Sequence, residues 1–262
     1  MEQSPLGQDG REVEGRWSWL GRAAFPDTAV LQERLRQQVL AGESPERLLL
    51  LEHDPVLTLG RRARAENVLL PEALLAARGI TLHAASRGGD VTYHGPGQLV
   101  GYPIVRLRAG VRGHVRGMAS AIAEVLGELG IDARYREDAP GLWVGGGEES
   151  AGRKICAFGV NVHRRVTIHG FALNLAPDLA AFDTIVPCGL AGVRVTSVQV
   201  ERGSAPSPEA LAPRLADALG QRLGVRFVRD DTALTSGRAD TATRADTIGI
   251  AMRGQATTMG RA

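Results

Sequence analysis

Two thiols and a scarce amine are the groups in this sequence best suited to nucleophilic chemistry. Cys188 lies in the loop-like stretch IVPCGL, between Pro187 and Gly189. A rigid neighbour and a permissive one favour an exposed sulfur beside free backbone N–H groups. Because only the thiolate is nucleophilic, a catalytic cysteine needs a nearby group that favours its ionisation. The sequence therefore raises the question of which side chain assists a reactive thiol.

Cys156 and Lys154 share the run KICAFGV, whose alternation is typical of a half-buried strand. We predict that Cys156 is a small buried hydrophobe. For Lys154 the pattern alone leaves two interpretations, a lysine extending from a sheet edge or a partner of the thiol. An ammonium beside sulfur stabilises the thiolate, and a partly buried lysine can accept a proton. Lys154 and Cys188 are 34 residues apart (188 − 154), so only the fold can join them.

Three histidines offer a rival base, because a cysteine paired with histidine is the commoner arrangement. They are His94, His163 and His169. His94 and His169 are each followed by glycine, and we expect both rings to line a pocket as hydrogen-bonding walls. No pair among the six histidines has ligand spacing on one helix, so no metal site is expected.

The stretch SRGGDVTYHGPGQLVGYP, residues 86–103, combines glycine and proline with an arginine and a histidine. It fits neither GxGxxG nor GxxxxGK[ST], so neither phosphate-binding motif is present. One interpretation is a structural hairpin in which His94 makes its hydrogen bonds to other groups of the protein. The other is a backbone that approaches a ligand closely, because glycine leaves no Cβ in the way.

Composition narrows the class of protein. The chain has 262 residues and a formal charge of +2, which gives no argument for binding nucleic acid or a membrane surface. The sequence contains no run of about 18 apolar residues, the length that a membrane-spanning helix needs. Two cysteines cannot build a disulfide framework, so we expect a cytoplasmic protein with reduced thiols.

Helix and strand patterns alternate along the chain and predict an α+β fold, a mixed or antiparallel sheet flanked by helices. Helices are predicted at 26–42, 71–79, 114–130 and 207–224, with Pro213 expected to kink or shorten the last. Strands are predicted at 47–52, 56–59, 80–86, 99–107, 141–146, 153–165 and 166–176, with a hairpin tip at 145–150. In the first helix the spacing predicts one face of Val30, Leu31, Arg34, Leu35, Gln38 and Val39.

The domain boundaries follow from the same patterns. Residues 1–15 lack apolar periodicity and are expected to be flexible. Residues 16–229 are expected to form a single catalytic domain, and 230–262 a disordered C-terminal tail.

The run RGGDVTYHGPGQLVGYP closely resembles the signature of the lipoyl(octanoyl) transferases. Further pieces agree in order: EHDPVLTLG, GRKICAFGVNVHRRVTIHGFALNL, IVPCGL and VTSV, which together cover most of 47–200. The resemblance implies the catalytic-domain fold of the biotin and lipoate protein ligases. It also implies Cys188 as nucleophile and Lys154 as its partner. The implied substrate-binding walls are Arg87, Gly88, Gly89, Asp90, Val91, Thr92, Tyr93, His94, Ala157, Phe158, Gly159, Gly170, Phe171 and Ala172.

The activity implied by this resemblance is a two-step acyl transfer without a cofactor. Octanoyl would pass from octanoyl-acyl carrier protein to Cys188 and then to a lysine of a lipoyl domain. The acceptors would be lipoyl domains of 2-oxo acid dehydrogenases and the glycine cleavage H protein. Arg61, Arg62 and Arg64 are candidates for contact with the acidic carrier. A monomer is expected.

Three alternatives stay open. One is an ATP-dependent lipoate or biotin protein ligase, which would need no cysteine. Another is an amidotransferase that moves octanoyl between lipoyl domains. The third is a binding protein that has lost turnover.

Overall fold

The structure is a computed structural model that describes residues 13–146, 152–187, 192–230, 232 and 234. Its strands are β1 (Glu14–Ala23), β2 (Glu46–His53), β3 (Val56–Leu59), β4 (Thr81–Ala84), β5 (Val91–His94), β6 (Gln98–Ile104), β7 (Ala133–Arg136), β8 (Gly141–Val144), β9 (Arg153–His163), β10 (Val166–Asn174), β11 (Arg194–Val195) and β12 (Arg226–Arg229). Its α-helices are α1 (Phe25–Ala41), α2 (Glu72–Ala77), α3 (Gly110–Glu128), α4 (Val198–Arg202) and α5 (Pro208–Leu223). Two short 3₁₀ helices are η1 (Ala65–Asn67) and η2 (Leu179–Thr184).

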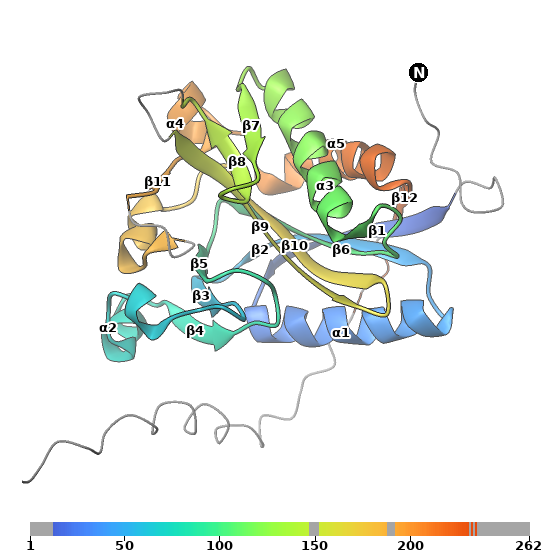
Figure 1. Ribbon diagram of the computed structural model, residues 1–262, viewed down its shortest axis with the longest axis horizontal. Helices are drawn as coiled ribbons and strands as arrows, with labels where there is room; N and C mark the ends of the chain where they lie inside the picture. Colours follow the sequence, from blue (N-terminus) through green and yellow to red (C-terminus); the bar gives the residue numbers. More distant parts are fainter. Residues whose placement is uncertain (1–12, 147–151, 188–191, 231, 233, 235–262) are drawn as a thin grey trace, which may run out of the picture.

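Within the described residues the strands form two sheets (Figure 1). The large sheet has the order β12-β1-β2-β6-β10-β9-β8-β7, and β11 pairs with β9. Its β1 runs parallel to both β12 and β2, whereas β2, β6, β10, β9, β8 and β7 pair antiparallel in turn. The small sheet has the order β4-β3-β5. Helix α1 covers one face of the large sheet, and α3 and α5 cover the other (Figure 1). The predicted α+β fold with a mixed sheet flanked by helices is confirmed.

Helix α1 buries Leu31, Leu35 and Val39 as the spacing predicts, but the rest of its buried face differs from the prediction. Its buried residues are Phe25, Thr28, Leu31, Gln32, Leu35, Arg36 and Val39. Val30 is half exposed, and the predicted row of Val30, Arg34 and Gln38 therefore does not form the packing face. The helix is rotated so that two polar residues, Gln32 and Arg36, face the sheet. The helix ends at Gly42, whose left-handed backbone (φ 78°) closes the last turn.

Helix α5 runs through Pro213 to Leu223, so the expectation that Pro213 shortens it is wrong. Ser207 caps the start of the helix, and its hydroxyl accepts from the Ala210 N–H. Residues on both sides of Pro213, including Ala212 and Leu215, are buried against the core. This burial outweighs the local preference of proline for a helix end.

The structure adds strands where the sequence predicts loops. Glu14 and Gly15 belong to β1, so the ordered chain begins before residue 16. Strand β5 lies inside the glycine-rich stretch and pairs with β3. Most of the predicted tails, residues 1–12 and 235–262, lie outside the described residues, as do residues 147–151 of the predicted hairpin tip. No helix in the described part of the chain is long and apolar enough to cross a membrane.

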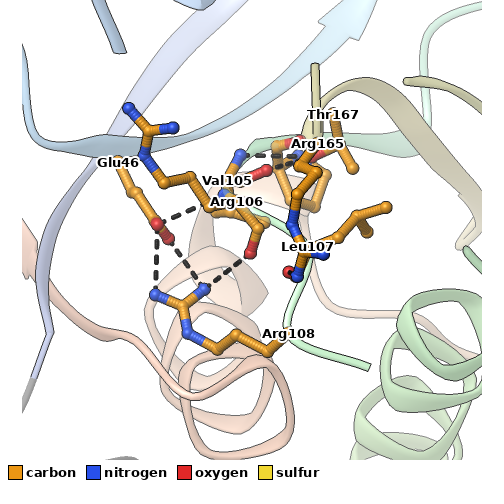
Figure 2. Close-up of polar contacts among 8 residues, drawn as sticks. Glu46, Val105, Arg106, Leu107, Arg108, Arg165 and Thr167 are labelled. Atoms are coloured by element: carbon orange, nitrogen blue, oxygen red, sulfur yellow. Dashed lines mark hydrogen bonds and ion pairs between the residues drawn. The ribbon is translucent and has the colours of Figure 1, made fainter. Parts of the chain in front are cut away.

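Beyond the end of β6, backbone pairing with the start of β10 continues through the Arg106↔Val166 bridge, and side chains add further contacts (Figure 2). The Thr167 hydroxyl accepts from the Val105 N–H at 3.1 Å and lies 2.7 Å from the Pro103 carbonyl, to which it donates. Farther along, the buried Glu46 carboxylate binds the Arg108 guanidinium at 3.0 and 3.1 Å and accepts from the Arg106 N–H. The Thr167 contacts thus tie the start of β10 to the end of β6, and Glu46 ties the segment after β6 to β2.

Candidate active site

A cavity of about 840 Å³ lies beside the β9–β10 hairpin. Its lining comes from residues 87–92 and His94, from the first turns of α3, from 137–140, from Lys154 and 157–160 of β9, and from 169–172 of β10. The structure thus brings together Lys154 and all the predicted wall residues except Tyr93. Among the described residues, no group of three or more His, Cys, Asp or Glu side chains is arranged to hold a metal ion.

Tyr93 lies outside this lining because neighbouring side chains of a strand point to opposite faces. It is buried under η2, where its ring meets Phe182 edge-on at 5.4 Å between centroids. His94, the next residue of β5, lines the cavity. The prediction for Tyr93 treated residues 87–94 as a uniform loop and missed the alternation of β5.

Arg87 organises the wall formed by residues 86–94 rather than presenting its charge to the cavity. Its Nε and Nη2 atoms donate to the Thr58 hydroxyl at 3.2 and 2.8 Å, and Nη2 also donates to the Thr58 carbonyl. Its Nη1 donates to the carbonyls of Gly88 and Asp90 at 3.1 and 2.8 Å. The side chain is 8% exposed. Arg87 therefore clamps this segment to β3 in one conformation.

The glycines around the cavity serve different needs. A Cβ on Gly170 would lie 2.3 Å from the Gly101 carbonyl oxygen, and one on Gly159 would lie 3.1 Å from Cδ of Arg87. Gly170 therefore lets two strands approach closely, and a side chain at position 159 would require Arg87 or the Gly88 carbonyl to shift slightly. At Gly88, by contrast, the nearest atom to a Cβ would be 3.6 Å away, which is ordinary contact. Gly88 is thus the position where the backbone lies open to a ligand.

Lys154 reaches the cavity because of an irregularity in β9. The pairing of β8 with β9 shifts by one residue between Leu142↔Cys156 and Trp143↔Lys154. In a regular strand Lys154 and Cys156 would share a face, but a bulge redirects one side chain. Cys156 accordingly packs in the core beneath α3 and α5, whereas Lys154 lines the cavity.

The Lys154 side chain is 4% exposed. Its Nζ lies 5.1 Å from the centroid of the Trp143 ring, a cation–π distance. Gly141 leaves room for the chain, because a Cβ there would lie 2.3 Å from Cε of Lys154. The Lys154 carbonyl accepts from the Thr196 N–H at 2.9 Å, and β11 pairs with β9 through Val195 and Lys154. Several elements therefore hold this amine in place.

The structure describes Cys156 but not Cys188. Cys156 is 1% exposed, which confirms the prediction of a buried hydrophobe. Burial raises the pKa of its thiol, and the nearby Lys154 only partly opposes this effect. Cys188 lies outside the described residues. On its two sides, Val186 donates its N–H to the Asn67 carbonyl at 2.8 Å, and Val195 pairs with Lys154.

His94 and His169 both line the cavity, and both are almost completely buried. Burial, with smaller contributions from Arg87 and Arg36, lowers the pKa of His169 to about 3. Burial, the neighbouring His53 and Arg87 hold the pKa of His94 well below its usual value. Both rings are therefore neutral at pH 7. His163, the third candidate, is exposed near the turn that joins β9 and β10.

A chain of buried hydrogen bonds joins His94 to the backbone of Lys154. His94 Nδ1 lies 2.7 Å from Gln98 Oε1, and Gln98 donates to Asn174 Oδ1 at 2.9 Å. Asn174 in turn donates to the Thr196 carbonyl at 2.9 Å, and the Thr196 N–H donates to the Lys154 carbonyl. One wall of the cavity is thereby coupled to the position of the amine.

Sequence reasoning missed the polar residues that α1 contributes beneath the cavity. Gln32 is completely buried and its Oε1 accepts from the His169 N–H at 2.8 Å. Arg36 donates to Asn161 Oδ1 at 2.8 Å, and Asn161 donates to the Ser86 carbonyl at 2.9 Å. The available signal was a glutamine and an arginine four residues apart, each next to a leucine of the buried face.

Arginines stand at the edge of the cavity. Arg61 and Arg62 are exposed and line it, and their backbone N–H groups donate to the carbonyls of Arg87 and Gly89, both at 3.0 Å. Arg64, grouped with them on sequence, is exposed but does not line the cavity. On the opposite side, Arg112 of α3 lines the cavity and is also exposed.

Comparison with known proteins assigns the family. Residues 27–220 match the family described as the lipoyl protein ligase A/B catalytic domain. The chain is 44% identical over 192 residues to an octanoyltransferase of Acidobacterium capsulatum, covering 70% of this chain and 78% of that protein. It is 44% identical over 204 residues to an octanoyltransferase of Chloroflexus aggregans, covering 76% of this chain and 90% of that protein.

The fold also resembles solved structures. A bi-partite lipoate protein ligase from Thermoplasma acidophilum, described with its E2 lipoyl domain, matches with a TM-score of 0.66. That match covers 84% of this chain and 88% of the other at 18% sequence identity, so it supports the fold alone. Together, the matched profile and the similar sequences mean that the chain belongs to the lipoyl protein ligase A/B catalytic-domain family, and within it to the octanoyltransferases.

Proposed function

We propose that this acyltransferase moves octanoyl from octanoyl-acyl carrier protein to a specific lysine of an apo lipoyl domain through a thioester on Cys188. Lys154 accepts the proton of the Cys188 thiol and later that of the incoming amine. The acceptors are the lipoyl domains of 2-oxo acid dehydrogenases and the glycine cleavage H protein. The enzyme acts in the cytoplasm as a monomer and uses no cofactor.

The observation that carries this proposal is the position of Lys154. It is the only lysine in a chain with 31 Lys and Arg residues, and it lies buried on the cavity wall. The other 30 of these 31 side chains (31 − 1) are arginines, and a guanidinium does not give up its proton in proteins. A lysine at this one position therefore supports a role in proton transfer, beyond supplying a positive charge.

The choice of nucleophile rests on the contrast between the two thiols. Cys156 is sealed in the core with its pKa raised by burial, which disfavours the thiolate that attacks a carbonyl. Cys188 is seven residues (195 − 188) before Val195, which pairs with Lys154. This short separation in sequence from the backbone partner of Lys154 supports the choice of Cys188.

The transfer proceeds in two balanced steps. The Cys188 thiolate attacks the carbonyl carbon of the octanoyl thioester, and the carbon–sulfur bond to the carrier breaks. The carrier thiol leaves with the proton that Lys154 held. The lysine amine of the lipoyl domain then attacks the octanoyl-enzyme, an amide forms, and the bond to the sulfur of Cys188 breaks. Lys154 takes the proton of the amine and returns it to that sulfur, which restores the thiol. Because a thioester is already activated, no ATP is consumed.

Intact-mass spectrometry after mixing with octanoyl-acyl carrier protein tests the proposal. The wild type and Cys156→Ala are expected to gain one octanoyl group, and Cys188→Ala none. Subsequent addition of apo lipoyl domain should remove the group from the enzyme and add it to the domain. An adduct that persists in Cys188→Ala and disappears in Cys156→Ala would overturn the choice of nucleophile.

Two further arms separate the alternatives. A ligase would modify the lipoyl domain from free octanoate and ATP, and the replacement of Cys188 would not matter. An amidotransferase would accept octanoyl from an octanoylated lipoyl domain faster than from the carrier protein. Lys154→Arg keeps the charge but not the proton transfer, so we expect it to lower the rate of acylation at least about 100-fold.

A further inference from the structure

His169 has a left-handed backbone inside β10, with φ at 58°. The other described non-glycine residues with positive φ, Arg164 and Arg165, lie at the turn between β9 and β10. A residue with a side chain is disfavoured in this conformation by about 1–2 kcal/mol, whereas glycine adopts it freely. The chain has glycine at position 170 but keeps an imidazole at position 169.

The kink has a cause in the neighbouring strand. Continuing the register of Phe171↔Gly101 by two residues brings His169 opposite Pro103, which has no N–H to donate. The Pro103 carbonyl instead accepts from the Thr167 hydroxyl at 2.7 Å. The pairing of β10 with β6 is therefore interrupted at His169 and resumes at Thr167, whose N–H donates to the Val105 carbonyl at 3.0 Å. Because the Pro103 carbonyl is taken by the Thr167 hydroxyl, the His169 N–H uses another acceptor.

Gln32 provides that acceptor from α1. Its Oε1 lies 2.8 Å from the His169 backbone nitrogen, and the side chain is completely buried. Within the described residues its Nε2 has no hydrogen-bond partner. A buried amide nitrogen without a partner costs about 1–3 kcal/mol, so an apolar residue would suit simple packing better. The hydrogen bond that Gln32 Oε1 accepts from His169 therefore explains why a glutamine occupies this position.

The backbone conformation at position 169 determines where the imidazole points. The ring lines the cavity, and its Nε2 lies 2.9 Å from the Ser86 hydroxyl. It also meets the Tyr102 ring edge-on at 6.1 Å between centroids. No described residue hydrogen-bonds its Nδ1. One ring nitrogen is thus fixed by the protein, and the other is left for a ligand.

We propose that Gln32 is a positioning residue for octanoyl transfer, which holds the His169 backbone left-handed so that the imidazole faces the reacting groups. The inference rests on the proposed function. Gln32 itself touches no substrate and acts only through His169. Its removal lets β10 relax, and the ring turns away from the cavity.

The test is a double-mutant cycle on the octanoylation of the enzyme by octanoyl-acyl carrier protein. Gln32→Leu is expected to lower kcat about 10- to 100-fold at nearly unchanged KM, the scale of a misplaced group. Gln32→Glu keeps an acceptor oxygen and should stay within about threefold of wild type. In a His169→Ala background, Gln32→Leu should change kcat less than about twofold, because the ring it positions is absent.

Equal losses from Gln32→Leu with and without the imidazole would overturn the inference, as would a folded Gln32→Leu with wild-type kcat. If Gln32→Leu fails to fold, Gln32→Met replaces it, since methionine has similar length and no acceptor oxygen. A wild type that forms no octanoyl-enzyme contradicts the proposed function instead. In that case ¹⁵N-histidine spectra decide: unchanged His169 ring shifts in the Gln32 variant would refute the positioning role.

Discussion

The two faces of the large sheet bury different kinds of residue. Beneath α3 and α5 lies the largest core cluster, which is built almost entirely from aliphatic and small side chains and includes Cys156. Beneath α1 the apolar cluster is smaller. There the sheet and helix also bury polar groups, among them Gln32, Arg36, His53 and His169.

This difference suggests that one face mainly stabilises the fold and the other mainly orients the side chains of the cavity. The α3–α5 face gains from removing apolar surface from water, an effect without direction that tolerates small shifts. The α1 face instead uses hydrogen bonds, which require defined distances and angles. That face supports the cavity side that carries His94 and His169. We infer that the protein keeps its fold with one face and sets the orientation of its site with the other.

The largest effect is expected from truncation on the α3–α5 face. Leu219 of α5 is completely buried, and Leu219→Ala should lower the free energy of unfolding by about 3 kcal/mol. Urea denaturation followed by circular dichroism measures this, with Val200→Ala as a control because Val200 is 62% exposed. The kcat of the folded fraction should not change. A large loss of kcat at full folding would show that this face also sets the site.

Acidification should lower the stability of the protein mainly through the buried histidines of the α1 face. Burial lowers the pKa of His53 to about 4 from an unfolded value near 6.5. Between these values the unfolded chain binds a proton that the folded protein does not, so stability falls as the pH decreases. The loss from His53 between pH 7 and 4 is about 3 kcal/mol, and His94 and His169 act in the same direction.

Denaturation curves at pH 7, 5.5 and 4 measure this loss. His163→Gln provides the matched control, because this histidine is exposed. His53→Gln should make the pH dependence less steep than in the wild type. A variant at position 53 that retains the full slope would contradict the assignment.

Tyr102→Phe removes a single hydroxyl from the α1 face and keeps the ring. That hydroxyl lies 2.7 Å from His53 Nε2, and both groups are buried. We expect a loss of about 1–2 kcal/mol in the free energy of unfolding, because the imidazole nitrogen is left without a partner. Tyr135→Phe is the matched control, since the Tyr135 ring is only partly buried. Equal effects in the two variants would argue against directional bonding on the α1 face.

The smallest effect should come from His114, a polar residue buried in α3. Its Nε2 has no hydrogen-bond partner among the described residues, and burial lowers its pKa to about 4. We expect His114→Leu to leave stability unchanged or to raise it by up to about 1 kcal/mol. Thermal unfolding at pH 7 is sufficient to measure this. A clear loss would mean that polar groups matter on the α3–α5 face as well.

Most elements could be predicted because their signals are local. The helix stop at Gly42 and the strand at 56–59 follow from single residues and short runs. Strand β5 could not be predicted, because its glycine-rich surroundings hide the four residues that pair with β3. Half of the buried face of α1 was predicted wrongly for a related reason. Hydrophobic spacing cannot reveal that Gln32 and Arg36 are buried by partners on distant strands.

The lining of the cavity was predictable where a motif contained its residues. Thirteen of the fourteen predicted wall residues (14 − 1, without Tyr93) line the cavity together with Lys154. The bulge that turns Lys154 into the cavity has no sequence signature, because it depends on how β8 meets β9. Nor does the sequence reveal that Arg87 is a clamp, since its Nε and Nη2 atoms donate to Thr58, 29 residues earlier.

The first and last strands of the sheet are partners, which bears on how the chain acquires its structure. Gly15 of β1 pairs with Phe227 of β12, so the sheet edge closes only when residues 212 positions apart meet. During synthesis on the ribosome, β1 must therefore remain without one neighbour until nearly the whole described chain has emerged. Such a distant pairing slows folding and lengthens the period in which a nascent strand edge is open to chaperones.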